Sequence, residues 1–159
     1  MADRMGSTLR VATFNIGDFT GRGFEKGSEE GKQTIRATMA SVGATCWALQ
    51  EDVYDYGNGE EVYTALYSDY AHYTRHGTGE YNYKAFLTNE QLSDVAPVSY
   101  TGDMVFRHPW FLRGSLTLGD REICLISLHF DWSDKNVRAE QIRQVIAYHP
   151  WLSFKGISF

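Results

Sequence analysis

The chain contains little cysteine, and it lacks the long hydrophobic runs of a membrane protein. Only Cys46 and Cys124 are present among 159 residues, and both fall in apolar, strand-like runs. Two such thiols argue against a disulfide framework. They are more typical of cysteines that pack in the core of a protein in a reducing compartment. No stretch reaches transmembrane length, and the start, "MADRMGSTLR", has no apolar signal segment. We therefore expect a protein without a transmembrane segment that is cytoplasmic, the alternative being export by a route that the sequence does not show.

Long runs of one charge are also absent. The net charge is −5 and is spread along the chain, which argues against a protein held to nucleic acid by bulk electrostatics. An enzyme that binds a few phosphates locally remains compatible with this balance. No repeat, low-complexity tract or linker is found, while 43% of the residues are hydrophobic and ten are tyrosine. The length and this composition predict one globular domain with a substantial core.

The first fifty residues predict a strand, a helix and a second strand. "LRVATFN" (9–15) is rich in strand formers, and the glycines of "IGDFTGRG" end it. From Ser28 the apolar residues Ile35, Met39 and Val42 recur at helical spacing, and Gly43 is a natural stop. A strand follows at 46–49. A strand–helix–strand unit of this kind favours parallel pairing of its two strands.

The remaining pattern alternates short helices with strands. We expect a helix at 59–70, strands at 71–76, 83–88 and 95–100, and a hairpin of strands 110–118 and 122–130 around "GDR". Residues 133–148 predict a second long helix, with Ser133 as its N-cap. The order of the predicted helices and strands therefore points to the α/β class.

Three polar residues stand where apolar strands end: Asn15 after "VATF", Glu51 after "WALQ", and His129 after "LISL". Strands that run in one orientation would bring all three to one edge of a sheet, where ligands of α/β folds bind. A carboxylate that holds a divalent ion, an imidazole and an amide suit phosphoester hydrolysis. Taken singly, each has an ordinary alternative: an Asx-turn, a solvated acid and a hydrogen-bonded structural histidine.

The segments "LRVATFNIGDF", "ALQED" and "ISLHFDW…RAEQIRQV" resemble the first three motifs of the DNase I-like endonuclease/exonuclease/phosphatase superfamily. The resemblance covers residues 9–148 and is specific in the order and spacing of the motifs. It implies an α/β fold, the DNase I-like α/β/β/α sandwich. On this basis residues 1–8 form a flexible N-terminal segment, 9–148 a partial domain of this type, and 149–159 an atypical apolar tail.

The resemblance also implies an activity, that of a metal-dependent phosphoesterase or nuclease. Glu51 would bind Mg²⁺ or Mn²⁺, Asn15 would support the phosphate or a metal-bound water, and His129 would act on the scissile phosphate. Tyr83 and Arg113 fall where the superfamily often places phosphate-contacting residues, although they also suit a sheet aromatic and a surface strand residue. The substrate would be a phosphoester in nucleic acid, in a phosphorylated small molecule or in a lipid. Asp131 of "HFDW" either orients its loop or touches the substrate.

The second-half motifs of the superfamily are missing from this sequence. Neither "GDxN" nor a terminal Asp–His pair is found; "TGDM" (101–104) and "LGDR" (118–121) precede His129 and lack the asparagine. We therefore expect a truncated domain, with the first sheet, its helices and the start of the second sheet, and weak or no activity of this chain alone. The alternative is a catalytically silent binding or structural module that keeps the fold.

Strands such as "CWAL" and "ICLISL" are apolar on both faces. The two long helices can cover one face of the first sheet, and the sequence offers little for the other apart from the tail at 149–159. An open apolar sheet face is rare in a monomer. We therefore expect pairing through that face, in a homodimer or with a complementary chain.

Overall fold

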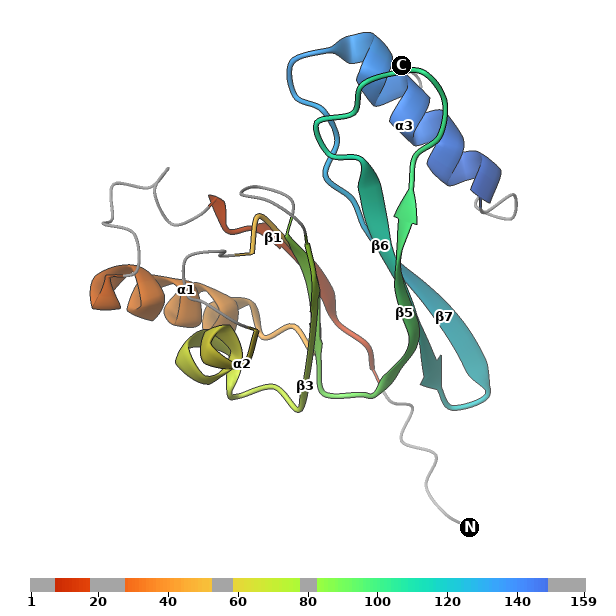
Figure 1. The fold of residues 1–159 in the computed structure, drawn as a ribbon. Coiled ribbons are helices and arrows are strands. Elements are labelled where there is room, and N and C mark those ends of the chain that lie inside the picture. Colours follow the sequence, from red (N-terminus) through yellow and green to blue (C-terminus); the bar gives the residue numbers. More distant parts are fainter. Residues whose placement is uncertain (1–7, 18–27, 53–58, 78–82, 149–159) are drawn as a thin grey trace.

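Two β-sheets lie face to face, with helices on the outer side of each (Figure 1). The computed structural model describes residues 8–17, 28–52, 59–77 and 83–148, so the expected apolar tail and nearly all of the expected N-terminal segment lie outside it. The elements are β1 (Val11–Asn15), α1 (Glu29–Val42), β2 (Cys46–Gln50), α2 (Gly59–Val62) with the π-helical turn η2 (Tyr63–Tyr67), β3 (His72–His76), β4 (Lys84–Thr88), β5 (Leu92–Ser99), β6 (Trp110–Leu118), β7 (Arg121–Ser127) and α3 (Lys135–Tyr148).

The first sheet has the strand order β1-β2-β4-β3. β1 and β2 are parallel, and the register pairs Val11 with Cys46 and Asn15 with Gln50. The parallel pairing predicted from the strand–helix–strand unit is confirmed. β4 runs antiparallel to both of its neighbours, so Lys84 lies between Gln50 on one side and His76 on the other.

Helix α1 begins and ends at the residues that the sequence predicts. The hydroxyl of Ser28 accepts a hydrogen bond from the N–H of Gly31 (3.1 Å), which satisfies one of the unpaired donors of the first turn. Gly43 ends the helix with φ of 63°, a conformation that is accessible to glycine without strain. The buried residues Ile35 and Met39 face the first sheet, where they pack with Trp47 and Leu87.

The second sheet has the order β5-β6-β7 and is antiparallel, so the predicted hairpin is confirmed. Its outer face packs against α3 through Tyr100, Phe111 and Val145. β7 ends at Ser127, three residues earlier than predicted, and His129 therefore lies in the loop that follows the strand.

The N-cap of α3 also differs from the prediction. Asp134, and not Ser133, accepts hydrogen bonds from the backbone N–H groups of Asn136 (2.7 Å) and Val137 (3.3 Å). The physical reason is that Ser133 is already engaged. Its hydroxyl and its N–H both donate to the carboxylate of Asp131, which shapes the turn before the helix.

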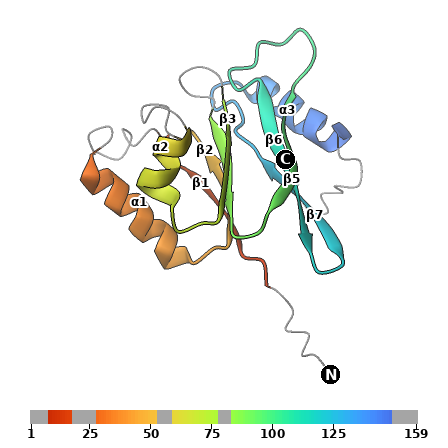
Figure 2. The same ribbon diagram turned by 60° about the horizontal axis from the view of Figure 1, so that its bottom comes forward.

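The space between the sheets is filled by apolar side chains from both. Cys46 and Phe86 of the first sheet pack against Leu112, Leu116 and Leu125 of the second. In Figure 2, α1 and α2 lie on one side of the first sheet, the second sheet lies on the other side, and α3 is outermost. The predicted sandwich architecture is thereby confirmed.

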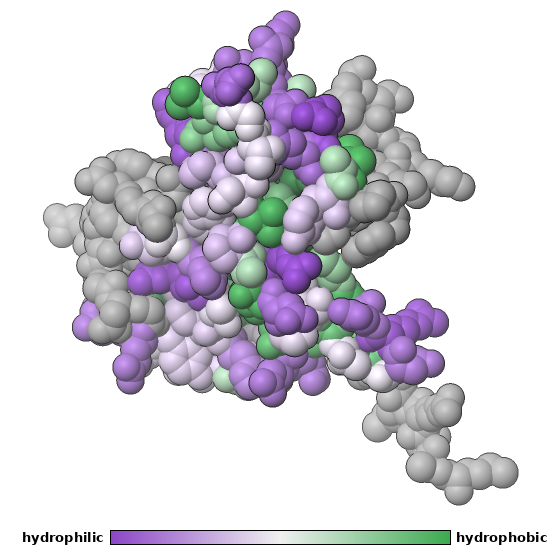
Figure 3. Space-filling view, turned by 45° about the vertical axis from the view of Figure 1, so that its right-hand side comes forward, coloured by the Kyte–Doolittle hydropathy of each residue, from purple (hydrophilic) through white to green (hydrophobic). Residues whose placement is uncertain are grey.

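This packing corrects part of one expectation. The inner face of the first sheet was expected to lack a cover, yet at β2 and β4 the second sheet covers it and buries Cys46 and Phe86. At the edge strand β1 the same face is exposed: Val11 lies beside Cys46 in the register and is 55% exposed. The uncovered surface is therefore confined to β1, and pairing through it with a second copy or a complementary chain stays a prediction. On the face of the molecule that Figure 3 shows, hydrophilic and hydrophobic residues are interspersed. In the part of the chain that the structure describes, no helix has the length and apolar character needed to span a membrane.

Truncating a side chain between the sheets should destabilise the protein strongly. Leu112 is fully buried in this cluster, and Leu112→Ala is expected to lower the free energy of unfolding by about 2–5 kcal/mol, because it removes apolar contacts and leaves a cavity. Urea denaturation followed by circular dichroism measures the loss. Val105→Ala is the control, since Val105 is 89% exposed and a surface truncation should change the stability by about 0.5 kcal/mol or less. Equal effects of the two substitutions would contradict the assignment of this core.

Candidate active site

Asn15, Glu51 and His129 meet at one edge of the sandwich. Glu51 directly follows β2 and Asn15 ends β1, so the parallel pairing places both at the carboxyl edge of the sheet. The Glu51 Oε1 and His129 Nε2 atoms are 3.3 Å apart. A Cβ placed on Gly17 would lie 3.6 Å from Asn15 Oδ1 and 3.8 Å from Glu51 Oε2, so these oxygens converge on the same glycine. The structure thus gathers the three strand-end residues into one cluster.

The backbone at Glu51 is strained. Its φ of 50° lies in the left-handed region, which costs a residue with a side chain on the order of 1 kcal/mol or more. This turn directs the carboxylate toward His129 and away from the direction that a continued strand would give it. Residues held in such conformations are common at functional sites, where the surrounding structure maintains them.

Asp52 anchors the end of β2 directly behind Glu51. Its carboxylate is fully buried and accepts hydrogen bonds from the hydroxyls of Tyr67 (2.6 Å) and Tyr73 (2.5 Å). Its N–H donates to the carbonyl of Tyr83 (3.2 Å). Burial raises the pKa of this carboxyl, while the two tyrosine hydroxyls oppose the rise. The second acid behind the strand therefore holds the turn in place and does not face the cluster.

Hydrogen bonds across the sheets fix the distance between Glu51 and His129. The buried Gln50 side chain donates to the hydroxyl of Ser127 (3.1 Å), and this hydroxyl donates to the carbonyl of Leu49 (3.1 Å). The last residue of β7 is thereby tied to the last residues of β2. Glu51 directly follows the end of β2, and His129 follows the end of β7 after one residue, Leu128, so their meeting is a consequence of the tie.

His129 stacks on a second histidine. The rings of His108 and His129 are 3.7 Å apart between centroids, with an angle of 23° between their planes. Gln141 of α3 is fully buried and holds both loops: its amide donates to the carbonyl of His108 (3.0 Å) and accepts from the N–H of Asp131 (2.8 Å). The helix predicted after the histidine motif thus positions the imidazoles from behind.

Burial favours the uncharged form of both imidazoles by lowering the pKa of each. It lowers the pKa of His108 to about 4, with the neighbouring His129 and Lys84 adding to the effect. Burial also lowers the pKa of His129, and Lys84 adds to this, although the Glu51 carboxylate opposes it. A neutral His129 that faces a carboxylate must carry its proton on Nε2. Its buried Nδ1 then presents a lone pair, and no partner for it is found in the described ranges.

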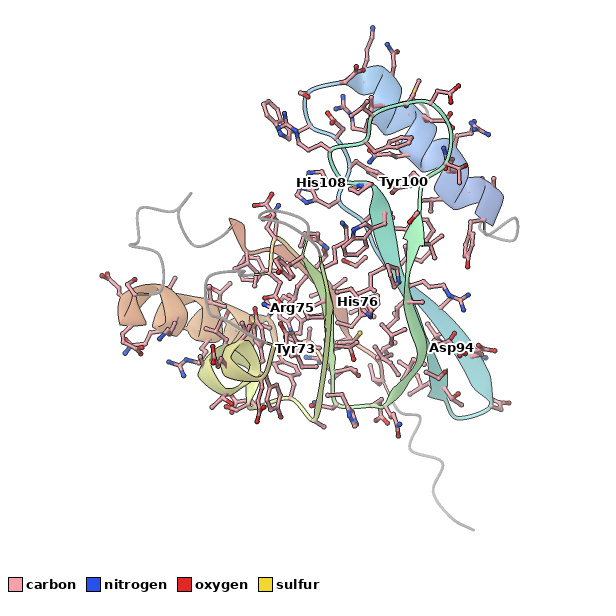
Figure 4. The ribbon with its side chains drawn as sticks, in the orientation of Figure 1. Tyr73, Arg75, His76, Asp94, Tyr100 and His108 are labelled. Carbon is pink, nitrogen blue, oxygen red and sulfur yellow. The ribbon has the colours of Figure 1, made fainter. Side chains whose placement is uncertain are left out.

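Lys84 lies beside these rings on the inner face of the first sheet. The side chain is fully buried, its Nζ lies 3.9 Å from the centroid of the Trp110 ring, and no hydrogen-bond partner for Nζ is found among the residues that the structure describes. Burial lowers the pKa of this amine from 10.5 to about 7. On the neighbouring strand His76 lies opposite Lys84 and points the same way, toward the second sheet, whereas Arg75 and Tyr73 point to the helix side (Figure 4).

The two weaker candidates lie outside this cluster. The Tyr83 ring packs under the Arg75 guanidinium at 4.6 Å and lines an open groove of about 600 Å³ along β3, with Tyr63 and Tyr73. This groove does not contain Glu51, Asn15 or His129. Arg113 lies on the face of β6 that carries Phe111, which packs toward α3, because alternate residues of a strand share a face. The structure therefore does not bring Tyr83 or Arg113 to the cluster.

Of the two alternatives for Asp131, the structure favours orienting the loop. Its carboxylate accepts hydrogen bonds from the N–H groups of Ser133 and Asp134 and from the Ser133 hydroxyl, all at 2.8–2.9 Å. The bond from the backbone of Asp134 is the main cause of the lowered pKa of this carboxyl. Arg138 donates to the Asp131 carbonyl (2.6 Å), which fixes the loop to α3.

Sequence reasoning missed Lys84 and His108. One signal for Lys84 was present: it precedes Phe86 and Thr88 at spacing two in a strand that is buried on both faces, so its side chain had to point into the interior. His108 carried no such signal, because it lies in an irregular segment before β6 and only tertiary packing brings it to His129.

Comparison with solved structures agrees with this architecture. Similar structures include D. rerio TDP2 complexed with a single-strand DNA product (TM-score 0.68, 12% identity, covering 91% of this chain and 56% of that one). An endonuclease/exonuclease/phosphatase family protein from Leptotrichia buccalis C-1013-b gives 0.60 at 15% identity, with 89% and 63% covered. An AP endonuclease from Archaeoglobus fulgidus gives 0.55 at 16% identity, with 89% and 47% covered.

The chain has the DNase I-like fold. The resemblance found in the sequence motifs is thus confirmed at the level of the fold, which is what a likeness at these identities establishes. The chain spans roughly half to two thirds of the length of these structures. No protein-family model and no curated protein matches the sequence.

The buried Lys84 should make the stability depend on pH. Its pKa of about 7 in the folded state lies below 10.5, so the unfolded chain binds the extra proton between these values and stability due to this group rises with pH. Lys84→Met removes the buried charge and should raise the free energy of unfolding at pH 7. This advantage should shrink by up to about 1.4 kcal/mol per pH unit toward pH 9.

Urea denaturation of the wild type and of Lys84→Met at pH 7, 8 and 9 tests the expectation. The buried tyrosines and thiols titrate equally in both proteins, so they do not contribute to the difference between the two free energies of unfolding. Lys135→Met, at an exposed position of α3, is the control for the lysine-to-methionine change itself. A difference that stays constant over this pH range would contradict the buried state of Lys84.

Proposed function

We propose that this chain carries the phosphate-binding and proton-handling part of a metal-dependent phosphoesterase. The observation that supports this most directly is the convergence of Glu51, His129 and Asn15 at the carboxyl edge of a DNase I-like sandwich. Carboxylate, imidazole and amide groups at this edge are what phosphoester hydrolysis requires. D. rerio TDP2, which shares the fold, is described with a single-strand DNA product, and this favours a phosphoester of a nucleic acid as the substrate class.

The donors present fit a loosely held divalent ion. Glu51 offers one carboxylate, 24% exposed, and the amide oxygen of Asn15 lies close by. Among the described residues no group of three or more His, Cys, Asp or Glu side chains could form a complete metal cage. Mg²⁺ suits such a set because it keeps most of its waters and uses one or two carboxylates together with substrate phosphates. When bound, Mg²⁺ or Mn²⁺ would polarise the phosphate and screen its charge.

The protein side chains have separate roles in the proposed reaction. His129 donates its Nε2 proton in a hydrogen bond to a phosphate oxygen, in place of the present contact with Glu51. Asn15 offers its amide N–H₂ to the same group, and Gln141 holds the loop of His129 rigidly during the step. The strained turn at Glu51 keeps its carboxylate beside His129 and Asn15.

A second candidate is supported by the composition of the cluster. Glu51 is the only carboxylate that contacts His129 in the described structure, and no further acid that could activate water is found beside it there. A module of this kind would bind a phosphorylated ligand without turnover. The two candidates share the phosphate site and differ in whether a bond is broken.

The first test is hydrolysis of bis(p-nitrophenyl) phosphate and of a single-stranded oligonucleotide with Mg²⁺ or Mn²⁺. Glu51→Gln and His129→Gln are each expected to lower the rate at least about 100-fold, because each removes a charge or a proton that the transition state needs. Glu122→Gln, at an exposed position of β7, is the matched control and should leave the rate unchanged. Metal-dependent phosphate binding without turnover by the wild type would establish the silent module and reject the enzyme.

The second test measures the metal directly. Mg²⁺ or Mn²⁺ binding is expected to be weak and to depend on Glu51, since one carboxylate supplies few of the about six oxygens that these ions prefer. Titration calorimetry, or Mn²⁺ electron paramagnetic resonance, should show binding to the wild type and none to Glu51→Gln. Tight binding that survives this substitution would place the metal elsewhere.

A further inference from the structure

Two further nitrogen-bearing side chains, His108 and Lys84, lie close to His129 on the side away from Glu51. Together the three side chains form a group of nitrogen atoms. The two rings stack, and the charge of Lys84 acts on both, lowering the pKa of each imidazole. Two nitrogens of this group, His129 Nδ1 and Lys84 Nζ, are buried without a hydrogen-bond partner in the described part of the chain. His76, opposite Lys84 on β3, adds a further imidazole to the same side of the sheet.

Negative charge near this group is sparse. Glu51 faces His129, and Asp131 raises the pKa of His108. The pKa of Lys84, in contrast, is lowered by burial, and among the described residues no carboxylate opposes this shift. The Trp110 ring face under Nζ is a weak electrostatic partner compared with a carboxylate. A buried amine in this environment destabilises the fold, and methionine would fill the same space without that penalty. The arrangement is best explained by a negative charge that arrives with a ligand.

We propose that Lys84 provides the positive charge that offsets the second negative charge of a terminal phosphate, so that the site prefers dianionic phosphomonoester groups to diesters. The inference rests on the proposed function in placing the phosphate at Glu51 and His129. A terminal phosphate carries close to two negative charges at pH 7, whereas a diester carries one. Lys84 acts by its field from behind His129 in a partly buried site, where charges interact more strongly than in water. The ligand is then the end of a phosphorylated molecule, such as a terminally phosphorylated strand, and not its interior.

The experiment compares two probes that differ by one methyl group and one charge, methyl phosphate and dimethyl phosphate. Their affinities for the wild-type chain are measured at pH 7 with Mg²⁺ present, by titration calorimetry or by ³¹P nuclear magnetic resonance. The wild type should bind methyl phosphate at least about tenfold more tightly than dimethyl phosphate. Lys84→Met should weaken methyl phosphate about tenfold and change dimethyl phosphate by no more than about threefold.

Arg113→Met is the matched control, because it also removes one positive charge, but from the outer face of β6. It should keep the preference of the wild type. Lys84→Gln repeats the loss of charge with a polar side chain, and a urea transition for each variant shows that it is folded. The inference is overturned if the wild type shows no preference, if both Lys84 variants keep it, or if Arg113→Met reduces it equally.

The outcome for Lys84 can be separated from that for the proposed function. If the preference is present and depends on Lys84 while no phosphoester is hydrolysed, the charge-selective site stands and the enzyme is rejected. If hydrolysis depends on Glu51 and His129 but the preference does not depend on Lys84, the enzyme stands and this inference is wrong.

Discussion

The hydrogen bond between Gln50 and Ser127 is the constraint from which the geometry of the site follows. It joins the last residue of β2 to the last residue of β7 across the sandwich, at a point where both side chains are fully or almost fully buried. A buried amide without a partner is costly, so slipping either strand would leave polar groups unpaired. Glu51 follows this point directly and His129 follows it by two residues, so the two side chains have little freedom to separate. The 3.3 Å contact between them is thereby built into the packing of the sheets.

The site contains features that do not favour stability. Glu51 has a left-handed backbone conformation, and Lys84 is an amine buried without a hydrogen-bond partner in the described structure. Each would be improved by a simple change, to glycine in the first case and to methionine in the second. Their coincidence within one cluster is typical of a functional site, where strain and unpaired charge are maintained by the surrounding fold. The rest of the described structure supplies that support, through Asp52 behind Glu51 and through the apolar packing around Leu112.

Helix α3 has a role beyond covering the second sheet. Gln141 is fully buried on the inner side of the helix, and its amide connects the loops of His108 and Asp131. One side chain thereby sets the position of both stacked imidazoles. The loops themselves are irregular, and their rigidity comes from this helix and from the hydrogen bonds that Asp131 accepts. The helix therefore links the second sheet to the edge of the first sheet where Glu51 lies.

The sequence by itself determined most of the helices and strands and indicated which residues would meet at the candidate site. Helix caps such as Ser28 and Gly43, apolar periodicity, and strands that end in Asn15 and Glu51 are local signals, because they depend on neighbours within one or two turns of chain. Those signals were enough to predict the parallel pair, the hairpin and the shared edge. The expectations that failed, wholly or in part, concerned what covers the first sheet, which residue caps α3 and where β7 ends. Each depends on partners that are distant in the sequence or that are already engaged in other contacts.

Only the tertiary structure decided how far each candidate residue lies from the contact between Glu51 and His129. It set Arg113 on the outer face of β6 and Tyr83 in a separate groove, and it placed His108 on His129. It also buried Lys84 without an acceptor in the described ranges, a property that no pattern of residue types expresses. The physical reason is that burial, unpaired charge and ring stacking arise between segments that the chain brings together only when the two sheets pack.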